Sequence, residues 1–262
     1  MLIFDSGVGG LSILQTIKIV LPNIHYIYFL DNEAFPYGNK TEYFIIQRII
    51  SIIKKIKKLY PINIVVIACN TVSTVSVSFL KKKFNLPIIG IFPDIKTAEK
   101  ITKNNIIGLI ATRTTIHSEY IQKLIYQKSF NNIIQIISTN QLALIAEKKI
   151  RKIPFAQKDL KSIFKPWINL NIKPDTIILG CTHFLFLKKE IKDTLHLTSS
   201  INFIDSRKKI VLDIKNCIYK FNLQQTIKNN IFLYSKHDNY LTKIFIYLKR
   251  YQFKKISYIN LN

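Results

Sequence analysis

Residues 64–71 read IVVIACNT, and residues 176–183 read TIILGCTH. Each stretch is an apolar run of the kind buried on both faces of a parallel sheet, followed at once by a cysteine and small polar residues. In open α/β sheets, ligands bind where the carboxyl ends of strands meet the first turns of the following helices. The two stretches therefore predict two equivalent corners of an α/β protein, with one cysteine at each.

The rest of the chain alternates between strand and helix patterns. Strand patterns cover residues 2–4, 25–30, 64–68, 106–111, 132–138, 176–180, 201–205, 229–234 and 255–260. Helical patterns lie between them, at residues 11–20, 41–59, 117–128, 142–150, 158–170, 207–221 and 240–251, with a further helix expected directly after His183. Thr41 is placed to cap its helix, and Pro166 is expected to kink or stop the helix that contains it. This alternation predicts an α/β fold of doubly wound parallel sheets.

Composition excludes several classes of protein. The chain has 262 residues, and 48% hydrophobic residues exclude a disordered polyelectrolyte. Three cysteines are too few for a disulfide framework, so we expect a reducing, cytoplasmic location. No apolar run of about 20 residues suggests a membrane span, and the first residues, MLIFDSGVGG, do not resemble a signal peptide.

The chain is strongly basic, with 39 Lys and Arg against 15 Asp and Glu and a formal net charge of +24. Such a charge attracts nucleic acid or anionic membranes. The lysines are spread along the whole chain, however, and no helix-turn-helix, zinc or RNA-binding motif accompanies them. Joint excess of Ile, Lys and Asn is what an AT-rich coding sequence produces. We therefore expect nucleic acid to bind only nonspecifically, if at all.

The paired cysteines, Cys69 and Cys181, suit one reaction class especially well. A racemase removes a proton from one face of a stereocentre and returns one to the other face. A thiolate on one side and a thiol on the other do this in both directions, and a thiol with a reference pKa of about 8.5 needs only modest tuning to titrate near neutrality.

Other interpretations of the cysteines stay open at this stage. A cysteine at a strand end is often only a small buried hydrophobic residue. We interpret Cys217, which stands in the helical pattern at 207–221, as a residue of that kind. Cys69, Cys181 and His183 could bind a metal, but no ligand spacing supports this. A Cys–His hydrolase is a further alternative, although Cys181 and His183 lie only two residues apart.

Five motifs in chain order carry a family resemblance: DSGVGGLSIL (5–14), DNEAFPYG (31–38), ACNT (68–71), IGLIATRTT (107–115) and GCTHF (180–184). With them the chain resembles the bacterial glutamate racemases nearly from end to end. The resemblance implies cofactor-independent, metal-free interconversion of L- and D-glutamate, which supplies D-glutamate for peptidoglycan. It also implies two pseudosymmetric α/β domains with the active site in the cleft between them.

The resemblance assigns roles to residues of this chain by motif. Cys69 and Cys181 would be the two proton donors and acceptors, Cys69 for D-glutamate and Cys181 for L-glutamate. Asp5, His183 and Glu147 would assist them, although a solvated helix residue is the rival interpretation of Glu147. The substrate would be bound by Asp5, Ser6, Tyr37, Gly38, Asn70, Thr71, Thr115, Thr182 and His183.

Three positions depart from the pattern of these racemases. Leu185 replaces the usual Pro after GCTHF, Thr114 replaces the usual Gly, and Asp94 stands where a small residue is expected. None of these changes removes a group that the resemblance places in catalysis.

We expect residues 1–95 and 207–262 to form the first domain and residues 96–206 the second. The crossings at 93–98 and 205–211 would act as a hinge.

Expected partners are the glutamate substrate and, by the resemblance, a peptidoglycan-precursor activator, and the protein would be a monomer or homodimer. Three alternatives remain: an aspartate racemase of the same superfamily, a degenerate nucleic-acid-binding protein, and a second role in inhibiting a DNA topoisomerase.

Overall fold

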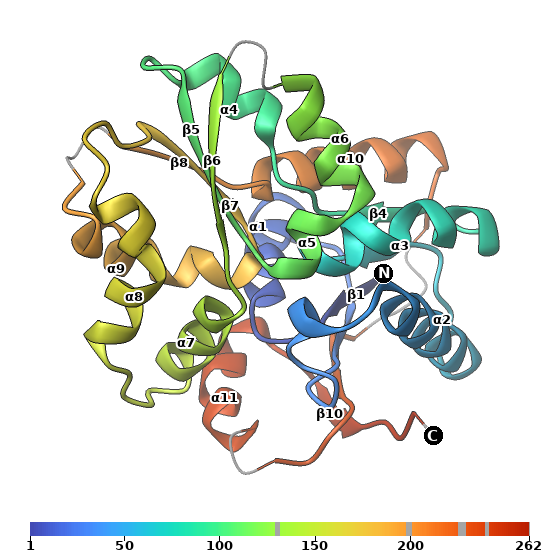
Figure 1. Ribbon diagram of the computed structural model, residues 1–262. Coiled ribbons are helices and arrows are strands. Elements are labelled where there is room, and N and C mark those ends of the chain that lie inside the picture. The colour runs from blue at the N-terminus through green and yellow to red at the C-terminus, as the bar shows by residue number, and fades with distance from the viewer. Residues whose placement is uncertain (129–131, 198–200, 225–228, 239–240, 262) are drawn as a thin grey trace.

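Two separate parallel sheets organise the molecule. The computed structural model describes residues 1–128, 132–197, 201–224, 229–238 and 241–261. In these residues the strand order is β10-β9-β2-β1-β3-β4 in a six-stranded sheet and β6-β5-β7-β8 in a four-stranded sheet, and every pairing is parallel. The predicted α/β class with two doubly wound parallel sheets is therefore confirmed (Figure 1).

Apolar strands form the centre of each sheet. The first sheet contains β1 (Leu2–Asp5), β2 (Ile27–Leu30), β3 (Val65–Ile67), β4 (Ile88–Gly90), β9 (Ile231–Tyr234) and β10 (Lys255–Tyr258). The second contains β5 (Ile106–Ala111), β6 (Ile133–Ser138), β7 (Thr176–Gly180) and β8 (Asn202–Ile204). The chain leaves the first sheet after β4 and returns to it after β8.

Helices cover both faces of each sheet. On the first sheet, one face packs against α1 (Gly10–Val20), α10 (Arg207–Lys220) and α11 (Leu241–Leu248), and the other against α2 (Glu42–Leu59) and α3 (Asn70–Lys83). On the second, α7 (Gln141–Ile150), α8 (Gln157–Ile168) and α9 (Lys188–Thr194) lie opposite α4 (Ile95–Ile101), α5 (Arg113–His117) and α6 (Glu119–Lys128). Short 3₁₀ turns occur at η1 (Tyr37–Asn39), η2 (Thr182–Leu187) and η3 (Lys249–Tyr251).

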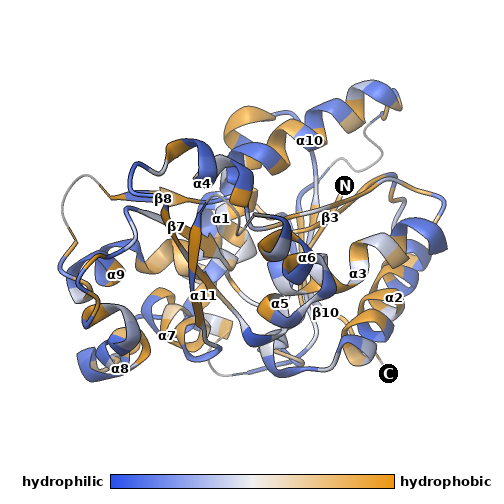
Figure 2. Cartoon of the chain, turned by 45° about the horizontal axis from the view of Figure 1, so that its top comes forward, coloured by the Kyte–Doolittle hydropathy of each residue, from blue (hydrophilic) through white to orange (hydrophobic). Residues whose placement is uncertain are grey.

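Helix α2 shows how the sequence pattern produces this arrangement. As predicted, Thr41 caps the helix, because its side chain accepts a hydrogen bond from the N–H of Phe44. Isoleucines at helical spacing, among them Ile45, Ile49 and Ile56, are buried against the first sheet. The lysines face away from it, and Figure 2 shows both hydrophobic and hydrophilic residues along the length of this helix. Much of the positive charge therefore lies behind apolar helix faces.

The structure differs from the sequence expectations in several elements. The strand β4 and the helix α4 were not predicted. The helix expected over 117–128 begins two residues later, as α6, and a separate short helix that was not predicted, α5, lies before it. Pro166 does not stop α8, which ends two residues later. A 3₁₀ turn stands where a helix was expected after Cys181. Residue 240, where the last helix was expected to begin, lies outside the described residues.

The two segments that join the sheets lie side by side. Ser206, directly before α10, donates a hydrogen bond from its hydroxyl to the carbonyl oxygen of Phe92, which precedes α4. Asp94 caps α4 by accepting a hydrogen bond from the N–H of Thr97, so this departure from the resembling racemases serves as a helix cap. Both crossings therefore pass through one region between the sheets.

Candidate active site

The first cysteine corner lies at the carboxyl end of β3. Cys69 is the N-cap residue of α3, and its sulfur lies 3.9 Å from the hydroxyl oxygen of Ser6, in the loop after β1. The side chain is almost fully buried. Burial raises the pKa of the Cys69 thiol well above its ordinary value, and negative charge on the nearby Asp5 and Cys181 adds to this effect. Cys69 is therefore held as a thiol, ready to donate a proton.

The second corner lies at the carboxyl end of β7. Cys181 caps the η2 turn and is also buried. Its sulfur lies 3.7 Å from Nδ1 of His183, and Nε2 of the same ring lies 3.0 Å from Oε1 of Glu147 on α7. The three side chains form a hydrogen-bonded series that ends at the sulfur.

This series favours a charged imidazole. Burial lowers the pKa of His183, but the hydrogen bonds and charges of Cys181 and Glu147 outweigh burial and raise that pKa well above its usual value. Burial likewise raises the pKa of Glu147, but His183, Arg151 and the N–H of Val8 outweigh it and lower the pKa overall. These pKa directions favour an imidazolium beside the sulfur of Cys181, paired with the ionised carboxylate of Glu147.

Asp5 connects the two corners. It ends β1 and accepts hydrogen bonds from the N–H groups of Ser6 and Gly7, while its other oxygen accepts one from the hydroxyl of Thr182, beside Cys181. Burial raises the pKa of Asp5 to about 6, although the positive charge of His183 and these hydrogen bonds oppose the rise.

The glycine-rich loop after β1 packs tightly against the second corner. A Cβ atom at Gly7 would lie 2.4 Å from Oε1 of Glu147 and 2.5 Å from Nε2 of His183. A Cβ at Gly9 would similarly meet Thr182 and His183. Glycine is therefore needed here for close approach between the loop of the first sheet and the acid–base groups of the second.

Three threonine hydroxyls join the two sheets on another side of the cysteines. Thr71, on α3, lies 2.8 Å from Thr112 and 3.2 Å from Thr115, measured between hydroxyl oxygens. Thr112 and Thr115 begin α5 and lie 2.8 Å apart. Asn70 has a different partner, because its side-chain amide donates to the carbonyl of Ile91 at 3.5 Å. The structure brings Thr71, Thr115 and Thr182 to the cysteine corners, whereas Asn70 reaches back to its own sheet.

The Pro-Tyr-Gly segment lies beside this threonine group. The hydroxyl of Tyr37 donates to the carboxylate of Asp31, so the ring is anchored within the first sheet. The carbonyl of Gly38 accepts a hydrogen bond of 2.9 Å from Thr114, at the start of α5. Tyr37 thus contributes its ring and backbone here, and Gly38 connects the segment to the second sheet.

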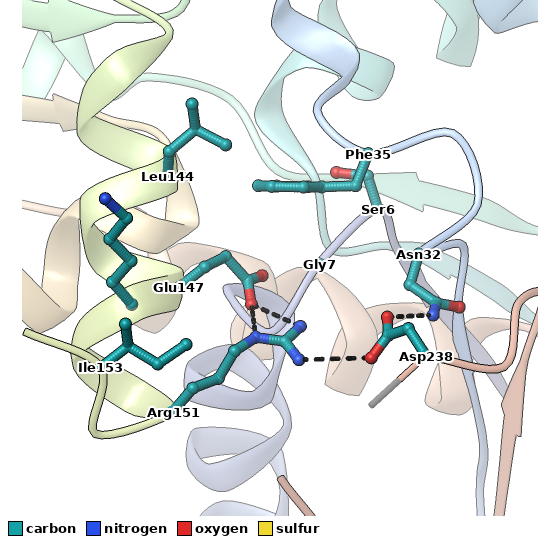
Figure 3. A pocket seen from close by; sticks show the side chains of 10 residues that line it. Ser6, Gly7, Asn32, Phe35, Leu144, Glu147, Arg151, Ile153 and Asp238 are labelled. Atoms are coloured by element: carbon teal, nitrogen blue, oxygen red, sulfur yellow. Dashed lines mark hydrogen bonds and ion pairs between the residues drawn. The ribbon is translucent and has the colours of Figure 1, made fainter. Parts of the chain in front are cut away.

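A pocket of about 390 Å³ opens next to the two corners. Its wall includes Ser6 and Gly7 on one side and Glu147 with Arg151 on the other, and Asp238 lies across from Arg151 (Figure 3). Ser6 contacts the sulfur of Cys69 and Glu147 contacts His183, so two residues of the pocket wall adjoin the two corners, although neither cysteine lines the pocket itself.

Sequence reasoning missed several residues of this region. Asp31 lies at the end of β2 and accepts hydrogen bonds from Tyr37, Arg48 and Ser235. Arg151 contacts Glu147, and Thr112 joins the hydroxyl group described above. Asp31 is the first residue of the DNEAFPYG motif, so the sequence could have identified it as a candidate, but it could not have predicted its hydrogen-bond partners. Arg151 carried no signal that set it apart from other basic residues.

Two further observations concern the described residues as a whole. In them, no three His, Cys, Asp or Glu side chains gather in a manner that could hold a metal ion. None of the described helices combines the length and apolar character needed to cross a bilayer.

A family model and individual relatives all place the chain among racemases. Residues 12–211 match the family described as Asp/Glu/hydantoin racemase. The chain is 66% identical to a protein named glutamate racemase from Buchnera aphidicola subsp. Acyrthosiphon pisum (strain Tuc7), over the full length of both. It is 47% identical to the glutamate racemase of Photorhabdus laumondii over 194 residues, 74% of this chain and 68% of that protein.

Solved structures point the same way. The fold matches the crystal structure of Escherichia coli glutamate racemase in complex with L-glutamate and the activator UDP-MurNAc-Ala with a TM-score of 0.91. The two chains are 35% identical, and the match covers 99% of this chain and 97% of the other.

Proposed function

The chain belongs to the Asp/Glu/hydantoin racemase family, and from this membership and its two cysteine corners we propose that it interconverts L- and D-glutamate without a cofactor. Its reaction is an isomerisation, the racemisation of an amino acid. One observation carries the proposal: Cys69 and Cys181 lie at equivalent strand ends of two different sheets, and Asp5 joins them, because it accepts hydrogen bonds from Ser6, which contacts Cys69, and from Thr182, which follows Cys181.

The proton transfers follow from the surroundings of each sulfur. The Cys181 thiolate, paired with the imidazolium of His183, takes the α-proton of L-glutamate and becomes a thiol. The thiol of Cys69 donates its proton to the opposite face of the resulting carbanion, which gives D-glutamate and leaves a thiolate at Cys69. The reverse reaction runs in the opposite sense, so that one proton is lost and one gained in each turnover.

The groups around the cysteines support substrate binding. We assign the substrate carboxylates to hydrogen bonds from side chains or backbone of Ser6, Tyr37, Gly38, Asn70, Thr71, Thr115 and Thr182. In the structure the hydroxyls of Ser6 and Thr182 bond to Asp5, those of Thr71 and Thr115 bond to each other and to Thr112, and that of Tyr37 bonds to Asp31. Bound glutamate would replace such protein–protein hydrogen bonds with its own. Asp5 and His183 would complete the binding site and assist the proton transfers.

We propose that the two sheets belong to two domains, residues 1–95 with 207–262 and residues 96–206, which move about the crossings at 93–98 and 205–211. The adjacent position of these crossings, with Ser206 bonded to Phe92, supports a single hinge. Closing the domains would exclude water from the carbanion, and opening would release the product.

Three finer points extend the proposal to the cell. D-glutamate made by this reaction would enter peptidoglycan synthesis in the cytoplasm, where the precursors are made. The Escherichia coli relative was solved with UDP-MurNAc-Ala as an activator, and it is 35% identical to this chain over almost its full length. We therefore include activation by a peptidoglycan precursor of this kind in the proposed function.

A substrate panel tests the function directly. Purified protein is mixed separately with L-glutamate, D-glutamate and L-aspartate, with and without UDP-MurNAc-Ala, and optical activity is followed over time. We expect both glutamate enantiomers to racemise and aspartate to remain unchanged. Racemisation of aspartate alone would favour the superfamily alternative. Salt-dependent DNA binding without proton exchange on any amino acid would instead favour a degenerate binding protein.

A further inference from the structure

Arg151 has contacts on both sides of the pocket described above. It follows α7 directly, and its side chain is nine-tenths buried. On one side it reaches Glu147, and on the other it faces Asp238, which belongs to the loop after β9 of the first sheet (Figure 3). Arg151 therefore lies between the acid–base series of the second sheet and a loop of the first.

The inner contact is two-pronged. Nε of Arg151 donates a hydrogen bond to Oε2 of Glu147 at 2.9 Å, and Nη2 forms an ion pair with the same oxygen at 2.8 Å. The other oxygen, Oε1, accepts from the N–H of Val8 at 2.7 Å and contacts Nε2 of His183 at 3.0 Å. Both carboxylate oxygens are thus engaged, and Arg151 fixes the plane of the carboxylate that orients the imidazole.

The outer contact is looser. Nη1 of Arg151 lies 4.0 Å from Oδ1 of Asp238, and neither atom has a hydrogen-bond partner although both are buried. Oδ2 of Asp238 accepts a hydrogen bond of 3.1 Å from the side-chain amide of Asn32, after β2. A charge pair therefore spans the pocket, with its two members anchored on different sheets, and a small movement of the sheets would close or widen the gap.

We propose that Arg151 is a positioning residue for proton transfer at Cys181, and that Asp238 holds Arg151 in place from the opposite wall of the pocket. The proposal rests on the proposed racemisation. Arg151 touches neither substrate nor sulfur; it acts through Glu147 and His183. Asp5 also bears on His183 through its charge, but it belongs to the other sheet and to the Cys69 corner.

The consequence is an asymmetry between the two half-reactions. Loss of Arg151 loosens the carboxylate behind His183 and leaves Cys69, Ser6 and Asp5 unchanged. Proton transfer at Cys181 then becomes the slower of the two transfers. A defect that merely loosened the fold would slow both transfers alike, so the two enantiomers report the difference.

Deuterium isotope effects test this asymmetry. Arg151→Gln and Arg151→Lys are compared with wild type using glutamate that carries deuterium at the α-carbon. For Arg151→Gln we expect kcat to fall about tenfold relative to wild type. The deuterium isotope effect on kcat should become larger with L-glutamate, which loses its α-proton to Cys181, and smaller with D-glutamate. Arg151→Lys keeps the charge without the two-pronged geometry and should recover part of the loss. Asp238→Asn should change both isotope effects in the same directions, by less.

Lys123→Ala is the matched control, because Lys123 forms an exposed ion pair with Glu119, also one turn apart on a helix. It should behave like wild type. Isotope effects that stay unchanged with both enantiomers in Arg151→Gln would overturn the proposal.

A second measurement does not depend on turnover. The imidazole of His183 is titrated by NMR in wild type and Arg151→Gln, with its signal identified by its absence in His183→Gln. We expect the pKa of His183 to rise on the order of one pH unit in Arg151→Gln, because a positive charge that competes for the carboxylate of Glu147 is removed. An unchanged titration would contradict the role of Arg151 even if the protein proved inactive on glutamate. Inactive wild type with the expected NMR shift would overturn the racemase function alone.

Discussion

Thr182, in the turn after Cys181, donates a hydrogen bond of 3.1 Å to Asp5, in the corner that contains Cys69. The two corners are therefore joined directly across the sheets. Asp5 is buried and also accepts hydrogen bonds from two backbone N–H groups. Its ionisation state therefore affects both the stability of this junction and the charge beside Cys69.

Asp5→Asn should change how stability depends on pH. The pKa of Asp5 is about 6 in the folded protein against an ordinary 3.8. Asp5 therefore favours the folded state most below about pH 4, and this contribution is lost as pH rises through about 6, a total on the order of 3 kcal/mol. The asparagine variant has no such proton, so it should gain stability relative to wild type over this range. Urea unfolding at several pH values measures the free energy of unfolding of both proteins. If the two free energies changed with pH in parallel, this prediction would be contradicted.

Tyr37→Phe should affect stability more than substrate binding. The hydroxyl of Tyr37 is bonded to Asp31, which keeps Arg48 and Ser235 as partners when the hydroxyl is removed. We expect a loss of about 1–2 kcal/mol in the free energy of unfolding, with the KM for glutamate within about threefold of wild type. The control Tyr43→Phe changes an exposed tyrosine on α2 and should alter neither. A large rise in KM at unchanged stability would show that the hydroxyl binds substrate.

Thr114→Val should weaken the connection between the Pro-Tyr-Gly segment and the second sheet. The Thr114 hydroxyl lies 2.9 Å from the carbonyl of Gly38 and 3.2 Å from that of Lys40, and valine cannot donate to either. Loss of one such bond, on the order of 1 kcal/mol, should raise the KM for glutamate about three- to tenfold. Thr114→Ser keeps the hydroxyl and should restore the wild-type KM. Steady-state kinetics give the KM of each variant, and equal KM values for Thr114→Val and Thr114→Ser would exclude this role for the Thr114 hydroxyl.

Local patterns in the sequence were enough to predict the fold class and the positions of both cysteines. Long apolar runs such as residues 64–68 and 176–180 are characteristic of parallel strands, and the polar residues after them mark the ends where sites form. The strand β4 was missed because it is only three residues long, Ile88–Gly90, and so short an apolar run between two prolines shows no strand periodicity. Tertiary pairing with β3 makes it a strand.

The contacts within the site needed the folded structure. Arg151 lies close to Glu147 in sequence, but many basic residues stand one turn from an acidic one in so basic a chain, and only burial beside His183 distinguishes this pair. Tyr37 was expected to line the site, and its bond to Asp31 depends on the position of two loops that sequence does not specify. The 3₁₀ turn after Cys181 likewise depends on packing of η2 against α7.

In the proposed reaction Cys69 and Cys181 act on opposite faces of one α-carbon, and exchange of the α-proton in deuterium oxide reports on each face separately. Cys69→Ser and Cys181→Ser should each lose racemisation by roughly 10²- to 10⁴-fold, while Cys217→Ser, on α10 away from both corners, should retain it. Residual deuterium incorporation should appear in L-glutamate alone for Cys69→Ser and in D-glutamate alone for Cys181→Ser. Wild-type racemisation in either variant, or residual exchange of the same enantiomer in both, would contradict the two-cysteine mechanism.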